Sequence, residues 1–288
     1  MKIIFRTSRV LLSLALTLCF SHPAFPAPRV VSMSPAATEV LFSLGLEDKL
    51  IGVTRFCPLP EGSEIPRVAD ILGIDLETLL TMSPDLVVLS DMGAQLSGRI
   101  ERMGIAVFVM RDENLAALRS SIEELARLCG APSKGIALSD SIKAAEDEAA
   151  HLTKSLPRPR VAVVVDRDSE SGRSLYVAGR ASFYDEIIAL AGGVNAFEMG
   201  GVNYPRLSAE GMLVLDPDVI IDIIGSHAVR QAGGLTGPER WRGSSLRAVR
   251  DGAVHVISGD YALRPGPNVM RLIRDFTSFI HPEVVSPN

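Results

Sequence analysis

The chain has 288 residues, of which 47% are hydrophobic and 22% charged, so it can bury a full core and predicts a folded protein of about two domains. Its 29 Lys and Arg against 34 Asp and Glu give a net charge of −5, which disfavours a nucleic-acid binder because such proteins carry a basic surplus. Three cysteines are too few for a disulfide scaffold.

The N-terminus has the pattern of a secretory signal peptide. Lys2, Arg6 and Arg9 precede an uncharged apolar run over residues 10–20, and small residues and prolines follow. The apolar run is shorter than the roughly 20 residues that span a bilayer, although a membrane anchor stays an alternative. We expect residues 1–27 to be a signal peptide and the mature chain to work in the periplasm, with the cleavage site left open.

The cysteines leave two questions open. Cys19 lies in the apolar N-terminal run and could carry a lipid anchor, but Leu18 is bulky where a lipidation signal has a small residue. We therefore expect no lipid anchor. Cys57 and Cys129 remain in the mature chain, and the sequence does not decide whether they form a disulfide.

Residues 28–131 show the alternation of strand and helix patterns that is typical of an α/β lobe. Ser34 can cap a helix whose first position suits Pro35 and which Gly45 ends. Continuous apolar runs, each followed by turn or polar residues, lie at 30–33, 51–53, 86–89 and 106–110. Runs that are apolar on both faces and separated by helices indicate parallel strands buried in an α/β layer.

Residues 132–157 predict a single long helix. Apolar residues recur there at spacings of three or four, and Pro157 and Pro159 end the segment. Roughly 22 helical residues extend about 33 Å, which spans a small domain. After this connecting helix the strand pattern restarts at 160–166, 175–178, 219–224 and 253–258. Residues 158–288 are therefore expected to form a second α/β lobe.

The two halves resemble each other locally, which predicts an internal duplication. Glu77 and Glu210 each lie seven residues before a Pro-Asp pair that leads into a buried strand, and Glu39 and Glu186 each lie six residues before a glycine. Two lobes joined by one rigid helix leave a cleft between them. Open α/β sheets bind ligands beyond the carboxyl ends of their strands, so the loops there should line this cleft.

Several motifs, in order along nearly the whole mature chain, resemble one protein family. They are Arg29-Val-Val-Ser-Met-Ser-Pro with Thr38-Glu39, Leu50-Ile-Gly-Val-Thr-Arg-Phe-Cys-Pro, Tyr176-Val-Ala-Gly, Asp185-Glu-Ile-Ile, Tyr204-Pro-Arg-Leu-Ser and Arg264-Pro-Gly-Pro, together with the Glu77 and Glu210 units. The chain resembles the helical-backbone periplasmic substrate-binding proteins, the receptors of ABC importers for cobalamin, ferric siderophores and haem. The resemblance is closest to the cobalamin-binding branch.

The resemblance implies a fold and a partner. The expected fold is two three-layer, Rossmann-like lobes joined by a backbone helix, with a ligand cleft between the lobes and only slight closure on ligand. In this family one Glu from each lobe docks onto Arg clusters of the permease dimer, which works with ATPase subunits. Glu77 and Glu210 match these positions, and each begins a predicted helix. Plain helix capping is the alternative role.

The resemblance also implies a set of ligand contacts. The expected ligand contacts are Arg55, Phe56, Ile71, Asp91, Met92, Tyr204 and Arg264, of which Arg264 matches a family position close to the bound ligand and Arg55 lies in a predicted cleft loop. Phe56 and Tyr204 match aromatic residues around the corrin ring, whereas Ile71 and the Asp91-Met92 pair stand where cobalamin receptors have tryptophans. Fewer aromatic faces weaken stacking on a flat macrocycle.

Other side chains leave further ligands open. Arg180 and Arg206 join Arg55 and Arg264 in the predicted cleft loops, where guanidinium groups could pair with an anionic chelate or with the corrinoid phosphate. A haem receptor would need an axial ligand, for which the candidates are His227, Tyr184, Tyr204 and Met92. The expected ligand is cobalamin first, a ferric siderophore second and haem third, with no intrinsic cofactor and no bare metal site.

Two other classes of function are less favoured by the sequence. An enzyme is disfavoured because no G-x-G-x-x-G follows the first strand, no Walker loop is present and no G-x-S-x-G elbow presents a serine, so no catalytic residue is assigned. A scaffold or adhesion module would keep the fold without a ligand. We expect a monomeric receptor, with Trp241 in the core or at its rim.

Overall fold

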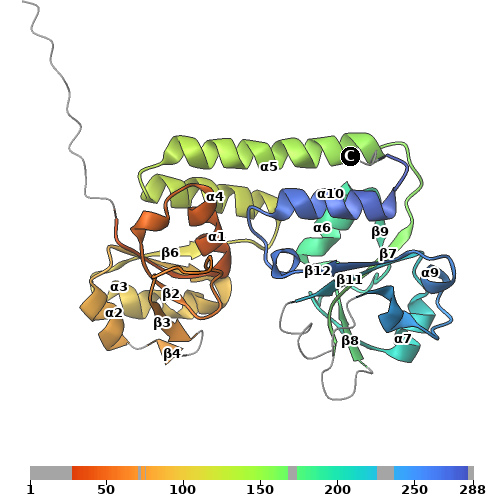
Figure 1. Cartoon of the computed structure of the whole chain (residues 1–288), viewed down its shortest axis with the longest axis horizontal. Helices are drawn as coiled ribbons and strands as arrows, with labels where there is room; N and C mark the ends of the chain where they lie inside the picture. The colour runs from red at the N-terminus through yellow and green to blue at the C-terminus, as the bar shows by residue number, and fades with distance from the viewer. Residues whose placement is uncertain (1–27, 71–72, 75, 168–173, 226–236, 285–288) are drawn as a thin grey trace, which may run out of the picture.

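A computed structural model describes residues 28–70, 73–74, 76–167, 174–225 and 237–284. It shows two α/β lobes side by side under one long helix, α5 (Pro132–Thr153), which runs over both of them (Figure 1). This confirms the expected α/β fold of two lobes joined by a single long helix. The predicted signal peptide with Cys19, as well as Ile71 and His227, lies outside the described residues.

The N-terminal lobe is built on a six-stranded sheet with the order β4-β3-β2-β1-β5-β6, in which only the pairing of β3 with β4 is antiparallel. The strands are β1 (Val30–Met33), β2 (Leu50–Thr54), β3 (Arg67–Asp70), β4 (Gly73–Ile74), β5 (Leu86–Ser90) and β6 (Ala106–Met110). The helices are α1 (Pro35–Ser43), η1 (Glu47–Lys49), α2 (Leu76–Met82), η2 (Asp91–Leu96), α3 (Ser97–Glu101) and α4 (Leu115–Leu128). As expected, Ser34 caps α1, because its hydroxyl accepts from the Ala37 amide at 3.2 Å.

The C-terminal lobe has a second six-stranded sheet, with the order β10-β8-β7-β11-β12 and with β9 paired to β7. Its strands are β7 (Arg160–Arg167), β8 (Ser174–Val177), β9 (Val194–Asn195), β10 (Arg206–Ser208), β11 (Val219–Ile224) and β12 (Val254–Ser258). Its helices are α6 (Phe183–Leu190), α7 (Ala209–Leu215), η3 (Pro238–Trp241), α9 (Arg247–Arg250), η4 (Asp260–Leu263) and α10 (Val269–Ile280). β8 is antiparallel to both of its neighbours, so this sheet is mixed.

The two lobes repeat one arrangement of elements. In each lobe the first strand, β1 or β7, pairs in parallel with β2 or β9 on one side and with β5 or β11 on the other. The last strand, β6 or β12, is parallel to β5 or β11. The final helix, α4 or α10, then packs against α5. The structure thus supports the duplication that the sequence predicts.

The Pro-Asp pairs explain part of this repeat. The Asp85 carboxylate accepts from the backbone amide of Arg29 at 2.7 Å, and the Asp218 carboxylate accepts from the amide of Arg160 at 2.9 Å. In both lobes the same arginine also donates from Nη2 to the carbonyl of the last residue of the short helix, at 3.0 Å for α2 and 3.3 Å for α7. Each Asp therefore ties the start of the first strand to the end of a short helix.

Helix α5 packs closely on the helices below it. Its buried positions recur at spacings of four and three, and they are Gly135, Ser139, Ile142, Glu146, Ala149 and Thr153. Gly135 lies so close to α4 that an added Cβ would collide with the Cβ of Ala126. The absence of a side chain at this position therefore sets the distance between the two helices.

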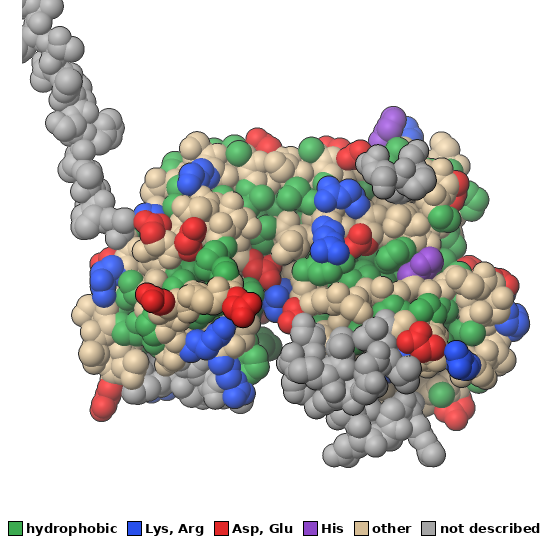
Figure 2. Space-filling view, viewed as in Figure 1, with side chains coloured by type: hydrophobic (Ala, Val, Ile, Leu, Met, Phe, Trp, Pro, Cys, Tyr) green, Lys and Arg blue, Asp and Glu red, His purple; other side chains and the backbone are tan. Residues whose placement is uncertain are grey.

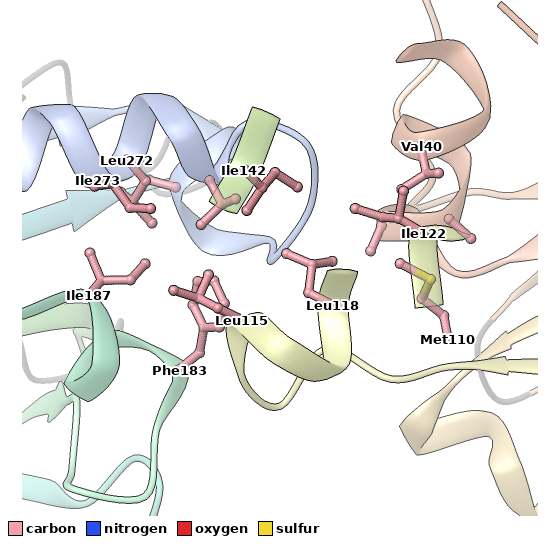
Figure 3. Close-up of a cluster of buried hydrophobic side chains, with 14 of the residues drawn as sticks. Val40, Met110, Leu115, Leu118, Ile122, Ile142, Phe183, Ile187, Leu272 and Ile273 are labelled. Carbon is pink, nitrogen blue, oxygen red and sulfur yellow. The ribbon is translucent and has the colours of Figure 1, made fainter. Parts of the chain in front are cut away.

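The hydrophobic core is continuous between the lobes. Figure 3 shows Leu115 and Leu118 of α4 between Ile122 on the N-terminal side and Phe183 on the C-terminal side, and all four are buried in one cluster. Each such side chain stabilises the fold by about 1.5–3 kcal/mol when fully buried. Because separation of the lobes would expose this shared core, we expect them to move little relative to each other.

Candidate functional site

The loops that follow the strands of the two lobes meet at the junction between the lobes. Glu39 of α1 contacts Arg264, which follows η4, and the Asp112 charge acts on Tyr204 from the opposite lobe. Figure 2 shows acidic and basic side chains side by side at this junction, where the surface recedes between the lobes. Residues of the two lobes therefore interact at the junction where the ligand cleft is expected.

Five large apolar side chains in the loops that follow strands of the two lobes are exposed. They are Phe56 (44% exposed), Met92 (70%), Met199 (68%), Val202 (52%) and Tyr204 (42%). The first two belong to the N-terminal lobe and the other three to the C-terminal lobe. Three of the five, Phe56, Met92 and Tyr204, are predicted ligand contacts.

The loop after β2 is held firmly although Phe56 is exposed. The Arg67 Nη1 donates to the carbonyls of Thr54, Arg55 and Cys57 at 3.0, 2.9 and 3.1 Å. The Arg55 guanidinium lies 4.5 Å from the centre of the Phe56 ring. Arg67 was not recognised from the sequence, since nothing in the pattern shows that one guanidinium folds back onto three carbonyls.

Carboxylates gather after β5 and β6 of the N-terminal lobe. Burial raises the pKa of Asp112 to about 6, and the charges of Glu113 and Asp91 add to the effect. Asp91, at the start of η2, is exposed beside Met92. Asp112 was not predicted from the sequence, although it lies two residues after the predicted strand at 106–110 and ligands of open α/β sheets bind beyond the carboxyl ends of the strands.

The facing wall of the C-terminal lobe presents Tyr204. Burial, together with the nearby Asp112 charge, raises the pKa of this phenol. Its ring meets the Tyr184 ring edge-on at 6.3 Å, and the Tyr184 hydroxyl donates to the Ala262 carbonyl at 2.6 Å. Tyr184 is only 4% exposed, so its proposed role as an axial haem ligand is wrong.

The predicted arginines differ in their surroundings. The Arg264 guanidinium donates to the Glu39 carboxylate at 3.0 Å and lies 3.8 Å from Asp260, so it is largely engaged within the protein. Arg206 belongs to β10, and it and Arg180 are exposed. The positive charge that is available to a ligand is therefore smaller than the number of arginines suggests.

The remaining sequence candidates have structural roles. Cys57 and Cys129 are buried free thiols, and burial raises the pKa of Cys129 to about 11. Trp241 lies in the core as expected, where its indole donates to the Asp222 carboxylate at 2.9 Å. A cavity of about 440 Å3 between α5 and α6 lies on the side of the α5 helix and is separate from the residues above.

Two further features concern metals and membranes. Within the described ranges, no three or more His, Cys, Asp and Glu side chains come together in a group able to hold a metal ion. None of the helices in that part of the chain has both the length and the apolar character needed to cross a bilayer.

Glu77 and Glu210 occupy matching places in the two lobes. Each is the second residue of a seven-residue helix, α2 or α7, and each is exposed. Both helices end at a non-glycine residue with positive φ, Ser83 at 47° and Asp216 at 36°. Both lie on the side of the molecule opposite to α5 (Figure 1).

Comparison with known proteins decides the family. A model of the periplasmic binding protein family matches residues 30–254. The chain belongs to this family. The Vitamin B12-binding protein of Vibrio cholerae is 27% identical over 282 residues, which cover 93% of this chain and 96% of that protein. These similar proteins are binding proteins and not enzymes.

Solved structures agree with the family. The periplasmic vitamin B12-binding protein BtuF of Vibrio cholerae superposes with a TM-score of 0.73 at 25% identity, covering 89% of this chain and 97% of that one. The apo haem-binding protein RhuT of Roseiflexus sp. RS-1 superposes with a TM-score of 0.74 at 25% identity, covering 90% of this chain and 100% of that one.

A further relative by sequence is an ABC transporter substrate-binding lipoprotein of Bacillus subtilis, YvrC. It is 25% identical over 266 residues, which cover 88% of this chain and 80% of that protein.

Proposed function

We propose that this family member is the substrate-binding protein of an ABC importer, and that it captures a corrinoid such as cobalamin between its lobes and delivers it to the permease. The observation that carries the proposal is that Phe56 and Met92, in loops of the N-terminal lobe, and Tyr204, in a loop of the C-terminal lobe, are exposed. The similarity to vitamin B12-binding proteins over nearly the whole chain supports the choice of ligand.

The charges of the cleft favour a corrinoid over an anionic chelate. Asp91, Asp112 and Glu113 line the N-terminal wall, and carboxylates accept hydrogen bonds from amide groups but repel other carboxylates. The periphery of a corrinoid carries amides, whereas haem carries two propionates. We assign ligand contact to Arg55, Phe56, Asp91, Met92 and Tyr204, while Arg264 supports the wall through Glu39.

Haem is the second candidate ligand. The haem-binding RhuT is as similar in fold and identity as the vitamin B12-binding protein, and Tyr204 and Met92 are exposed side chains able to approach a haem iron. A ferric siderophore remains a third candidate on the resemblance alone.

Calorimetry of the mature protein with cyanocobalamin, haemin and a ferric hydroxamate tests the ligand. We expect one cyanocobalamin per chain, with binding at least tenfold weaker in Phe56→Ala and unchanged in Ile136→Ala, which removes an exposed side chain from α5. Asp112→Asn should weaken cyanocobalamin binding and strengthen any haemin binding. A protein that binds haemin, with a shifted Soret band, and ignores cyanocobalamin would overturn the assignment.

The proposed partner is a permease dimer with its ATPase subunits, reached through Glu77 and Glu210. Reversal of both charges should abolish the stimulation of ATPase activity in the cognate transporter while ligand affinity stays unchanged. The matched control reverses one exposed carboxylate per lobe elsewhere, Glu101→Lys with Asp251→Lys. Undiminished stimulation in the Glu77→Lys, Glu210→Lys variant would refute the docking role.

The proposed compartment is the periplasm, with residues 1–27 removed on export and a monomeric mature protein. Mass spectrometry of the protein released from its host by osmotic shock tests both points, because the denatured mass shows whether residues 1–27 are removed and the native mass shows whether the protein is a monomer. Retention of the full-length mass in the cytoplasmic fraction would contradict the proposal.

A further inference from the structure

Two glutamates cross the boundary between the lobes, and the function proposed above uses neither as a ligand contact. Glu39 lies on α1 and Glu186 on α6, and these are the first helices of their lobes. Each lies six residues before a glycine in the left-handed region, Gly45 with φ 61° and Gly192 with φ 79°. The two glutamates therefore hold equivalent places in the internal repeat.

Glu39 reaches from the N-terminal lobe to the segment before α10. Its Oε1 accepts from Arg264 Nε at 3.0 Å and forms an ion pair with Nη2 at 3.0 Å, and its Oε2 accepts from Asn268 Nδ2 at 3.4 Å. Only 9% of Glu39 is exposed. A Cβ at Gly266 would lie 3.0 Å from Glu39 Oε2, so a glycine at 266 permits this close approach.

Glu186 makes the reciprocal contact from the C-terminal lobe. Its Oε2 accepts from the backbone amide of Leu115 at 2.8 Å. Leu115 is the first residue of α4, so this amide has no partner within its own helix. The negative charge also suits the positive end of α4, which Asn114 caps through the Ala117 amide.

The two contacts are related by the same duplication that relates the lobes. In each contact, a carboxylate on the first helix of one lobe accepts hydrogen bonds at the start of the last helix of the other lobe. This last helix is α10 for Glu39 and α4 for Glu186. One contact alone would act as a pivot about which the lobes could still turn. Two separate contacts, together with the shared core in Figure 3, restrict that rotation.

We propose that Glu39 and Glu186 are positioning residues, a reciprocal clasp that fixes the width of the cleft before ligand arrives. The proposal rests on the cleft being the ligand site. A fixed width lowers the ordering cost of binding, because the two walls already stand at the distance that the ligand needs. Loss of the clasp should therefore widen the distribution of lobe distances and weaken binding together.

Distances between two spin labels, one per lobe, test the clasp by pulsed electron paramagnetic resonance. The labels go on cysteines introduced at the exposed positions Glu101 and Asp251, while the native Cys57 and Cys129 are buried. We expect Glu39→Ala with Glu186→Ala to at least double the width of the distance distribution in the ligand-free protein. Cyanocobalamin should then bind at least tenfold more weakly and dissociate faster.

Glu146→Ala is the matched control, because Glu146 is also buried and pairs with Arg119 at 3.0 Å, but between α4 and α5 and not across the cleft. It should lower stability and leave the distances unchanged. Glu186→Gln keeps an acceptor for the Leu115 amide and should restore most of the narrow distribution. If the double variant does not fold, each single variant should widen the distribution on its own.

An unchanged distribution in folded clasp variants, or equal widening in Glu146→Ala, would overturn the proposal. The ligand-free distances also keep the test separate from the proposed function. A protein that binds no cyanocobalamin but loses its narrow distribution without the clasp would refute the ligand and support the clasp.

Discussion

At the scale of single residues, the sequence offered candidate ligand contacts but not the side chains that hold them in place. Phe56 and Tyr204, two of these candidates, are exposed, and their contact with a ligand stays a prediction. The sequence could not show that Arg264 turns to Glu39, because that ion pair joins positions 225 residues apart. The same holds for Asp222 in the core. Its strand was predicted from the apolar residues around it, but the sequence could not show that its carboxylate accepts from Arg167 and Trp241.

Asp112 makes the stability of the protein depend on pH. Its pKa is about 6 in the folded state against about 3.9 in an unfolded chain, so between these values the folded state binds more protons. The free energy of unfolding should therefore fall as pH rises from about 4 to about 6, by at most about 3 kcal/mol.

The variant Asp112→Asn should remove this fall and be more stable than the wild type at pH 7, with the difference vanishing below pH 4. Urea unfolding between pH 4 and 7.5 measures the effect, and a carboxyl NMR titration of Asp112 gives its midpoint directly. Parallel stability curves for the two proteins would contradict the assignment.

At the scale of elements, the sequence predicted continuous apolar strands and missed short or polar ones. The runs that became β1, β5 and β11 are buried throughout or nearly so and almost wholly apolar, and the run that became β6 is apolar although only Met110 in it is fully buried. β4 and β9 have two residues each, too few for any periodicity. The direction of β8 was not predictable from its residues, because parallel and antiparallel pairing depends on the connection and the neighbouring strands.

The contact between α4 and α5 gives a prediction in which two effects oppose each other. Alanine favours a helix over glycine by about 1 kcal/mol, but at Gly135 its Cβ would collide with Ala126 and approach the backbone of Glu123 and Ile122. Overpacking typically costs about 1–3 kcal/mol, so we expect Gly135→Ala to be destabilising on balance.

Gly98 in α3 provides the matched control. Its nearest neighbour to an added Cβ is the flexible end of the Arg102 side chain at 3.7 Å, so Gly98→Ala should stabilise the protein by up to about 1 kcal/mol. Thermal and urea unfolding of both variants measure the difference. The same sign of effect at the two positions would contradict the close packing of α5 on α4.

At the scale of the whole molecule, the duplication puts two similar surfaces on the side opposite to α5 (Figure 1). From Glu77 to Met82 the burial pattern of α2 matches that of α7 from Glu210 to Leu215, with Leu79 and Met212 buried. Leu80 and Leu213 are exposed, at 51% and 46%, three residues after the proposed docking glutamates. Residues three apart on a helix share a face, so each glutamate has an apolar neighbour on the same surface.

These leucines should contribute to docking on the permease, since a repeated surface suits a partner that presents two similar subunits. Each buried leucine contributes about 1.5–3 kcal/mol, so Leu80→Ala with Leu213→Ala should weaken binding to the transporter by at least tenfold. Cyanocobalamin binding should stay unchanged, because neither residue lies in the cleft. Binding of the labelled receptor to the transporter in nanodiscs measures the first effect and calorimetry the second.

The control variant Ile136→Ala with Leu152→Ala removes equally exposed apolar side chains from α5, on the opposite side of the molecule. It should bind the transporter normally. Val214, which is 88% exposed on α7, has Thr81 as its counterpart on α2, so the two surfaces are similar but not identical. Val214→Thr should therefore weaken docking less than the double leucine variant does. Equal loss in the α5 control, or no loss without the two leucines, would refute their role in docking.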